Sequence, residues 1–177
     1  MALTTAQLQT LKTDITVTKA ATSYQGQTLL QWWNAGDDTT LAQFYQQPAS
    51  PDFWVWKTAV SKDELVNSVG PEGTTFNWSG NGFITRSAGE QAAWEQIFSV
   101  SGTVDASKAN VRQAFQDIFS GTGNAADNRT HLAAVARRRA TYGEALYATG
   151  TGSTASPATL TFEGVISATD VGQSRSA

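Results

Sequence analysis

Val111-Arg-Gln-Ala-Phe-Gln-Asp-Ile-Phe119 is the stretch of this chain with the clearest periodicity. Its apolar residues recur at i, i+3, i+4, i+7 and i+8, which is the spacing of one face of an α-helix. Asp105 or Ser107 is a candidate N-cap before the stretch, and Gly121 with Gly123 provides a stop after it. The pattern predicts an amphipathic helix that packs through one face, and a fold that is mainly α.

Further helices are predicted on both sides of this stretch. Ser61-Lys-Asp-Glu64 and Ser87-Ala-Gly-Glu90 have the pattern of capping boxes, which start helices at the residue after each serine. Elsewhere, apolar residues at helical spacing are followed by Gly or Pro stops. Together these signals predict a short helix from Lys62 and longer helices over 5–20, 27–34, 39–46, 88–100 and 125–148.

Two stretches do not follow the helical period. Residues 51–60 are aromatic and β-branched, but they are too few to distinguish a strand from a turn of buried helix. Residues 70–82 are rich in Gly, Asn, Ser and Thr, which predicts a loop or a small β-hairpin. The expected fold is therefore a helical bundle with a small β-hairpin or loop insertion.

The C-terminal part of the chain has a different composition. Residues 149–157, Thr-Gly-Thr-Gly-Ser-Thr-Ala-Ser-Pro, have no large apolar side chain with which to offset the entropy of ordering. Residues 158–166 then alternate apolar and polar side chains, as a strand does. We expect an α-helical core domain at 1–148 and an extended C-terminal arm at 149–177. The arm's candidate partner-binding residues are Leu160, Phe162, Val165 and Ile166.

Composition limits the classes of function. Charged residues are 15% of the 177, against roughly 25% in an average soluble domain. The formal net charge of −3 provides no overall basic field to hold nucleic acid. The absence of cysteine excludes disulfides and thiolate metal sites. The chain has no apolar run of ~18 residues and no basic and apolar leader at its start, so we expect no membrane partner.

The sequence holds no convincing catalytic constellation. His131 is the only histidine, no Gly-x-Ser-x-Gly motif accompanies it, and zinc would need carboxylates alone beside it. We interpret it as a partly exposed helix residue. The Gly-x-Gly patterns at 121–126 and 150–155 follow predicted helices, whereas a dinucleotide site needs a strand before the glycines. We therefore expect no enzymatic activity, no cofactor and no metal.

Two features are candidates for contacts with partners. Arg137, Arg138 and Arg139 form the only basic cluster, and on a helix they would point about 100° apart, with Arg139 on the apolar side. Structural ion pairing is favoured there, and a DNA contact stays open. Trp78, close to Phe76 in the Gly- and Asn-rich loop, is the best contact candidate among six tryptophans. Tryptophan is enriched in cores, protein interfaces and sugar-binding platforms.

Three stretches of the chain resemble a family of small tailed-bacteriophage proteins, often encoded among the head and tail morphogenesis genes. They are Gln47-Pro-Ala-Ser-Pro-Asp-Phe-Trp-Val-Trp-Lys-Thr-Ala-Val-Ser-Lys-Asp-Glu64, Lys108-Ala-Asn-Val-Arg112 and Ala148-Thr-Gly-Thr-Gly-Ser-Thr-Ala-Ser-Pro-Ala-Thr-Leu-Thr-Phe-Glu-Gly164. Within that class, the size, the helices and the arm are similar to head-to-tail connector (adaptor, head completion) proteins.

The resemblance implies a structural virion protein at the head-tail junction, made in the host cytoplasm. Copies of the chain, about twelve in a closed symmetric assembly, would form a ring below the portal protein. The C-terminal arm would dock on the portal, and the ring would extend the DNA channel, with only passing DNA contact, and carry the tail or nozzle protein. Trp78, Phe76 and the three arginines would then lie at inter-subunit or loop contacts. A capsid decoration or tail-completion protein and, more remotely, a carbohydrate-binding module are the alternatives.

Overall fold

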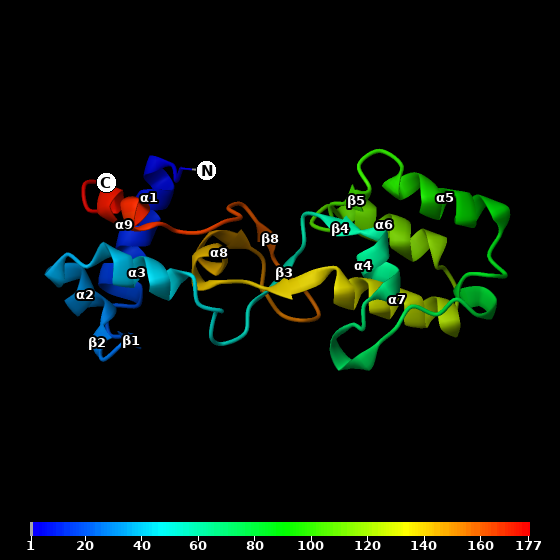
Figure 1. Ribbon diagram of the computed structural model, residues 1–177, viewed down its shortest axis with the longest axis horizontal. Helices are drawn as coiled ribbons and strands as arrows, with labels where there is room; N and C mark the ends of the chain where they lie inside the picture. Colours follow the sequence, from blue (N-terminus) through cyan, green and yellow to red (C-terminus); the bar gives the residue numbers. More distant parts are fainter. Residues whose placement is uncertain (1) are drawn as a thin grey trace. The chain divides into compact units, whose positions relative to one another are not determined.

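A computed structural model describes residues 2–177 (Figure 1). The chain divides into two compact units. Unit 1 holds the chain up to Phe53, residues 139–156 and residues 160–177, and unit 2 holds residues 54–138 and 157–159. Helices account for 49% of the chain and the strands are two or three residues long, so the mainly α prediction is confirmed. The two-unit division differs from the expected single core at 1–148 with an arm at 149–177.

Unit 1 consists of short helices with capped ends. Thr4 with Gln7, and Thr28 with Gln31, form capping boxes at two of the helices, and Gly36, with φ 77°, ends the second of these. Helix α9 lies against α1 and α3 (Figure 1). The elements are α1 (Thr5–Thr13), a π-helical turn (Asp14–Thr18), β1 (Ser23–Tyr24), β2 (Gln27–Thr28), α2 (Leu29–Ala35), α3 (Asp38–Tyr45), α8 (Tyr142–Tyr147), β7 (Ala148–Thr149) and α9 (Ala168–Ser174).

The π-helical turn places a carboxylate inside unit 1. Asp14 is 4% exposed, and its carboxylate accepts hydrogen bonds from the Tyr45 hydroxyl at 2.7 Å and from Lys19 Nζ at 2.9 Å. A buried carboxylate needs such partners, because water cannot solvate it. Burial, together with the charge of Asp14, raises the pKa of Tyr45 well above its usual value. The same two causes raise the pKa of Tyr147.

The C-terminal segment is part of the unit 1 core. Phe162, Ile166 and Val171 are buried in one cluster with Leu11, Leu41 and other side chains of α1 to α3, and Tyr147 packs edge to face on Phe162 at 5.5 Å. Residues 149–157 also form ordered contacts: Thr151 donates to the Ser156 carbonyl at 3.0 Å, and buried Gly152 lies against the Phe53 ring. The structure thus differs from the expectation of a tether and a free arm.

Gly143 explains how α8 and the C-terminal segment fit together. A Cβ at this position would lie 2.9 Å from Ile166 Cδ1 and 3.2 Å from the Tyr45 carbonyl oxygen. A Cβ here would force the Ile166 side chain and the Tyr45 backbone to shift, so the close packing favours glycine. The partners of α8 at this point are α3 and the C-terminal segment.

Unit 2 is built around an aromatic core. Phe76, Trp94, Phe115 and Phe119 are all buried, and Trp94 and Phe119 meet edge to face at 5.2 Å. The antiparallel pair β4–β5 aligns Val60 with Val104 beside this core. The elements are β3 (Trp54–Trp56), β4 (Val60–Ser61), α4 (Lys62–Asn67), 3₁₀ turns at Pro71–Gly73 and Gly80–Gly82, α5 (Ala88–Phe98), β5 (Thr103–Val104), α6 (Ala109–Ile118) and α7 (Asn124–Val135). Two further strands, β6 (Arg137–Arg139) and β8 (Thr159–Leu160), begin in unit 2, and the last residue of each belongs to unit 1.

The predicted helix starts in unit 2 are mostly confirmed. Ser87 and Glu90 form a complete capping box at α5, and Ser61 accepts from the Glu64 amide at α4, although the Glu64 carboxylate binds Lys57 instead of completing a box. The predicted N-cap of α6 at Asp105 or Ser107 is wrong. The N-cap is Lys108, whose side chain forms no capping bond, and Asp105 accepts hydrogen bonds from the Ser107 amide and hydroxyl in a turn before the helix.

The predicted helix over 125–148 is wrong, because the structure has two helices with a strand between them. Helix α7 ends at Val135, β6 follows, and Thr141 starts α8 as its N-cap. Thr141 and Glu144 form a capping box, in which the Glu144 amide donates to Thr141 Oγ1 at 3.2 Å and the Thr141 amide donates to Glu144 Oε2 at 3.0 Å. The capping box follows a run of residues that mostly favour a helix, so helix propensity alone does not show the break before Thr141.

Replacing Ile166 tests whether the C-terminal segment belongs to the core. Ile166→Ala should lower the free energy of unfolding by about 2–4 kcal/mol, because it leaves a cavity at a residue that is 1% exposed. Val165→Ala is the matched control; Val165 is 64% exposed, and its replacement should change stability by less than about 0.5 kcal/mol. Denaturant unfolding measures both. Equal, small effects would show that the segment is a free arm.

High pH should destabilise unit 1. A phenol whose pKa is higher in the folded than in the unfolded chain contributes stability that is complete below pH ~10 and is lost as the pH rises further. The raised pKa values of Tyr45 and Tyr147 therefore predict a free energy of unfolding that falls as the pH rises above about 10. Tyr45→Phe should cost about 1–3 kcal/mol at pH 7 and flatten this dependence. An unchanged slope in the variant would refute the assignment.

Candidate contact surface

The loop between α4 and α5, residues 68–86, presents the most exposed large aromatic residue. We call it the Trp78 loop. Phe76 is 7% exposed and packs edge to face on Phe119 at 5.7 Å, which fixes the middle of the loop to the core. Trp78 is 43% exposed and rests edge to face on Phe76 at 4.8 Å and Phe83 at 5.1 Å. Of the two predicted contact residues, Trp78 is at the surface and Phe76 supports it from below.

A single asparagine side chain holds both limbs of the loop. Asn128 of α7 is fully buried; its Oδ1 accepts from the Asn77 amide at 2.7 Å, and its Nδ2 donates to the carbonyls of Asn77 at 3.0 Å and Gly82 at 2.9 Å. These three bonds use both the oxygen and the nitrogen of the side-chain amide, and they satisfy backbone groups on either side of Trp78. The spacing of apolar residues does not single out Asn128, because it is a polar residue on the buried side of α7.

Further polar contacts fix the rim of the loop. Asn124 Nδ2 donates to the Ser79 carbonyl at 2.9 Å, and Asn81 Nδ2 donates to the Thr122 carbonyl at 2.7 Å. Arg86 donates to the Ser120 carbonyl at 2.8 Å and also binds the Ile118 carbonyl. The loop is therefore held in one arrangement before any partner arrives, with Val69, Trp78 and Ile84 exposed on it.

A cleft of about 610 Å³ opens beside Trp78. It is formed by one limb of the loop and the outer side of α7, and its walls carry hydroxyl, amide and carboxylate groups. Aromatic and polar groups converge there on one preformed hollow, which is the usual character of a binding site. Its lining residues are Gly73, Thr74, Thr75, Phe76, Asn77, Trp78, Ser79, Asp127 and Thr130.

His131 has a structural role, and the expectation that it is partly exposed is wrong. It is fully buried on α7, where Nε2 donates to the Leu65 carbonyl at 2.8 Å and Nδ1 lies 3.3 Å from Thr74 Oγ1. Because a carbonyl only accepts, the proton resides on Nε2 and the Thr74 hydroxyl donates to Nδ1. The histidine thus links α4 to the start of the Trp78 loop.

The three arginines lie on a strand and not on the helix that was predicted. In unit 2, the Arg137 guanidinium lies over the Trp54 ring, 5.3 Å from its centre. In unit 1, Arg139 pairs with Asp52 at 2.5 Å and donates to the Ala49 carbonyl at 3.3 Å, with its side chain 45% exposed. Arg139 therefore does not point into a bundle, although it has the carboxylate and carbonyl partners that were expected of it. Arg138 is half-buried.

The four candidate residues of the C-terminal segment are not equally available to a partner. Phe162 and Ile166 are buried in the unit 1 core, and Leu160 is half-buried. Val165 is 64% exposed and is the only one of the four at the surface. All four were predicted to bind a partner, whereas the side chains of Phe162 and Ile166 face the core of this chain itself.

The three stretches that carry the phage resemblance meet in unit 2. The Trp56 amide donates to the Ala158 carbonyl at 3.0 Å, and the Ala158 amide donates to the Trp54 carbonyl at 2.9 Å. The Arg112 guanidinium lies 4.7 Å from the centre of the Trp56 ring. Residues far apart in the sequence are therefore tied to one short strand, β3.

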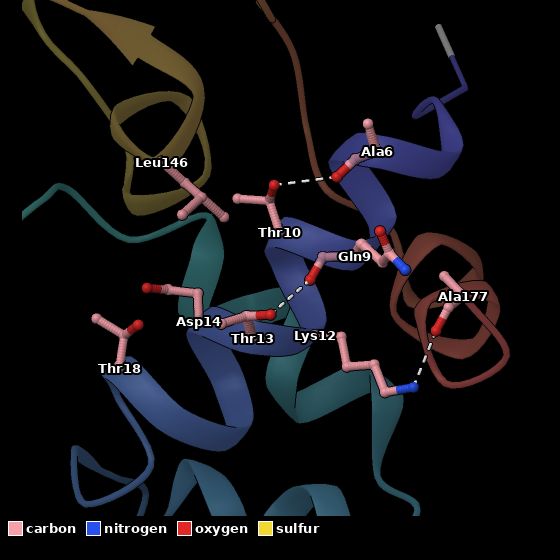
Figure 2. A pocket seen from close by; sticks show the side chains of 9 residues that line it. All are labelled: Ala6, Gln9, Thr10, Lys12, Thr13, Asp14, Thr18, Leu146 and Ala177. Carbon is pink, nitrogen blue, oxygen red and sulfur yellow. Dashed lines mark hydrogen bonds between the residues drawn. The ribbon is translucent and has the colours of Figure 1, made fainter.

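Unit 1 has a more open hollow, along α1 and the π-helical turn (Figure 2). Two of the hydroxyls that line it bond to their own helix: Thr10 donates to the Ala6 carbonyl and Thr13 to the Gln9 carbonyl, both at 3.0 Å. Lys12 Nζ donates to an oxygen of Ala177 at 2.9 Å. These groups already have protein partners, so the hollow offers a ligand less than the cleft beside Trp78 does.

Within residues 2–177, no three His, Asp or Glu side chains group closely enough to hold a metal ion. In that same part of the chain, no helix is long and apolar enough to cross a bilayer. Comparison of the chain with protein-family models, with curated proteins and with solved structures finds no match.

Removing the Asn128 amide should loosen the Trp78 loop. Asn128→Ala leaves buried backbone groups of Asn77 and Gly82 without partners, so we expect a loss of about 2–4 kcal/mol in unfolding free energy. Amide hydrogen exchange at Asn77 should accelerate with it. Asn81→Ala, which removes one exposed hydrogen bond, is the control and should cost less than about 1 kcal/mol. Equal effects of the two substitutions would contradict the anchoring role of Asn128.

Proposed function

We propose that this protein is a structural subunit of a tailed-phage virion, an adaptor that forms a ring below the portal at the head-to-tail junction. The phage assignment rests on the resemblance of the stretches 47–64, 108–112 and 148–164. The observation that carries a partner-binding role is the apolar side of the rigid Trp78 loop, which exposes Val69 and Ile84. Exposed large apolar residues on a preorganised loop suit a protein interface, since little entropy is lost on binding. No catalytic residue is assigned.

In this proposal, the ring forms by head-to-tail contact between copies. A closed ring of identical subunits needs two different complementary surfaces on each subunit. The Trp78 loop provides one of them, and its partner surface lies elsewhere on the neighbouring copy. The low content of charged residues, 15% of the chain, suits surfaces that end up against other proteins.

Docking on the portal is assigned to the exposed side of the C-terminal segment. Since Phe162 and Ile166 are committed to the core, the contact uses Val165 and its exposed neighbours Glu163 and Gly164. Release of the whole segment as a free arm would uncover a large part of the unit 1 core, which is unfavourable. The segment therefore docks without leaving its own subunit.

The charge distribution suits a channel through which DNA passes. A channel wall should not bind the phosphate backbone tightly, and binding scales with the number of phosphates that Lys and Arg neutralise. The net charge is −3, Arg139 is paired with Asp52, and Arg137 lies on Trp54. Contact with DNA is therefore transient, and the ring serves as the platform for the tail or nozzle protein.

Native mass spectrometry of the chain, alone and with the portal ring from the same genome, tests this function. We expect about twelve copies to add to one portal ring, the number that a matched closed symmetry requires. Val165→Asp should weaken portal binding at least tenfold, which is about 1.4 kcal/mol. Val100→Asp, at a valine that is 92% exposed in unit 2, is the matched control and should bind as the wild type does.

Each result has a separate meaning. Portal binding that is unaffected by Val165→Asp would reject the C-terminal segment as the docking surface while keeping the adaptor role. Failure of the wild-type chain to bind the portal would reject the adaptor role itself. Binding to empty capsids or to tails in the same assay would then identify a capsid decoration or tail-completion protein.

A further inference from the structure

We infer that the cleft beside Trp78 binds a neutral glycan. The cleft lies within unit 2, between the Trp78 loop and the exposed side of α7, and has a volume of about 610 Å³. A hollow of this size accommodates two or three sugar rings and lies in the range of ordinary ligand sites. The inference goes beyond the adaptor role and does not depend on it.

The aromatic part of the site is the Trp78 indole. Phe76 and Phe83 both meet its ring at steep angles, 64° and 81°, so they support the indole through edge-to-face contacts and neither is stacked on its face. Sugar rings present a face of C–H groups, which carry partial positive charge and are attracted to the negative face of an aromatic ring. A half-exposed, supported indole is a suitable platform for that contact.

The polar part of the site is complementary to hydroxyl groups. The Trp78 indole N–H, the Thr75 hydroxyl and the Asp127 carboxylate all belong to exposed residues that line the cleft, where they are accessible to water and to the hydroxyl groups of a sugar. The three groups together offer donors and acceptors, and a carboxylate accepts strongly from adjacent hydroxyls of one sugar. The negative charge of Asp127 disfavours uronic acids, sulfated sugars and phosphates, so the ligand class is neutral.

The site is formed before the ligand binds. The Asn77 backbone, next to Trp78, is held by Asn128, and the Ser79 carbonyl is held by Asn124. The Trp78 carbonyl also accepts from the Ile84 amide at 3.2 Å, which closes the turn that carries the indole. A sugar forms few strong contacts, so a site that loses little entropy on binding is required for measurable affinity.

The lining favours a sugar over a protein partner at this position. Interface hot spots are apolar pockets from which water is excluded, whereas most side chains around this cleft end in hydroxyl, amide or carboxylate groups. The more apolar neighbours, Val69 and Ile84, do not line the cleft. The loop therefore has a polar side for the glycan and an apolar side for contacts with protein.

Isothermal titration and saturation-transfer-difference NMR test the site on the full chain. The probes are maltohexaose, cellohexaose, chitohexaose, mannohexaose and dextran oligosaccharides. We expect at least one of them to bind with a millimolar or tighter dissociation constant. Trp78→Ala should weaken that binding at least tenfold, and Asp127→Asn should weaken it several-fold by lowering the acceptor strength.

Ile84→Ala is the matched control, since Ile84 is exposed on the same loop but outside the cleft. It should leave glycan binding unchanged. Circular dichroism at the titration temperature should show all three variants folded, with Trp78→Ala less stable than the wild type because it loses the contacts with Phe76 and Phe83. The absence of binding to every probe at 10 mM sugar overturns the inference, as does equal loss in Trp78→Ala and Ile84→Ala. If the wild type binds none of the sugars, and both Trp78→Ala and Ile84→Ala reduce assembly with the portal or with other copies, the surface binds protein instead.

Discussion

The hydrogen bonds of Asn128 are the constraint on which the candidate surface depends. One buried amide satisfies backbone groups of Asn77 and Gly82, so the loop around Trp78 cannot move away from α7 without leaving polar groups unpaired in the core. Gly82 fits this arrangement because a Cβ there would lie 2.3 Å from the Asn77 carbonyl oxygen. The surface chemistry of Trp78 and the cleft beside it therefore follow from one interior contact.

Unit 1 has a comparable dependence on an interior polar group. Asp14 reaches the core through a π-helical turn and is satisfied there by Tyr45 and Lys19. The C-terminal segment completes the same unit, with Ile166 packed against Gly143. Arg175 pairs with Asp38 at 2.6 Å, and its guanidinium lies 4.1 Å from the centre of the Trp33 ring. A segment held by this many contacts acts as a structural element of its own unit.

Local signals predicted helix starts better than helix lengths. Ser87 with Glu90 and the Gly36 stop are visible within a few residues, and the structure has them. The break between α7 and α8 was not predicted, because Ala133 to Ala140 favour a helix at every position while the capping box at Thr141 competes with it. The burial of Phe162 and Ile166 was not predicted either, because alternation shows that one side is covered but does not show by what.

The sequence by itself determined the mainly α class, most of the capped helix starts and the absence of cysteine chemistry, and it predicted Trp78 as a contact residue. Each of these depends on residue type or on spacing within one turn. Only the tertiary structure decided that the C-terminal segment completes unit 1, that the arginines follow β6 and pair with Asp52 and Trp54, and that Asp127 lies beside the Trp78 loop. These features depend on contacts between residues distant in sequence, and such contacts are selected by the packing of complementary surfaces.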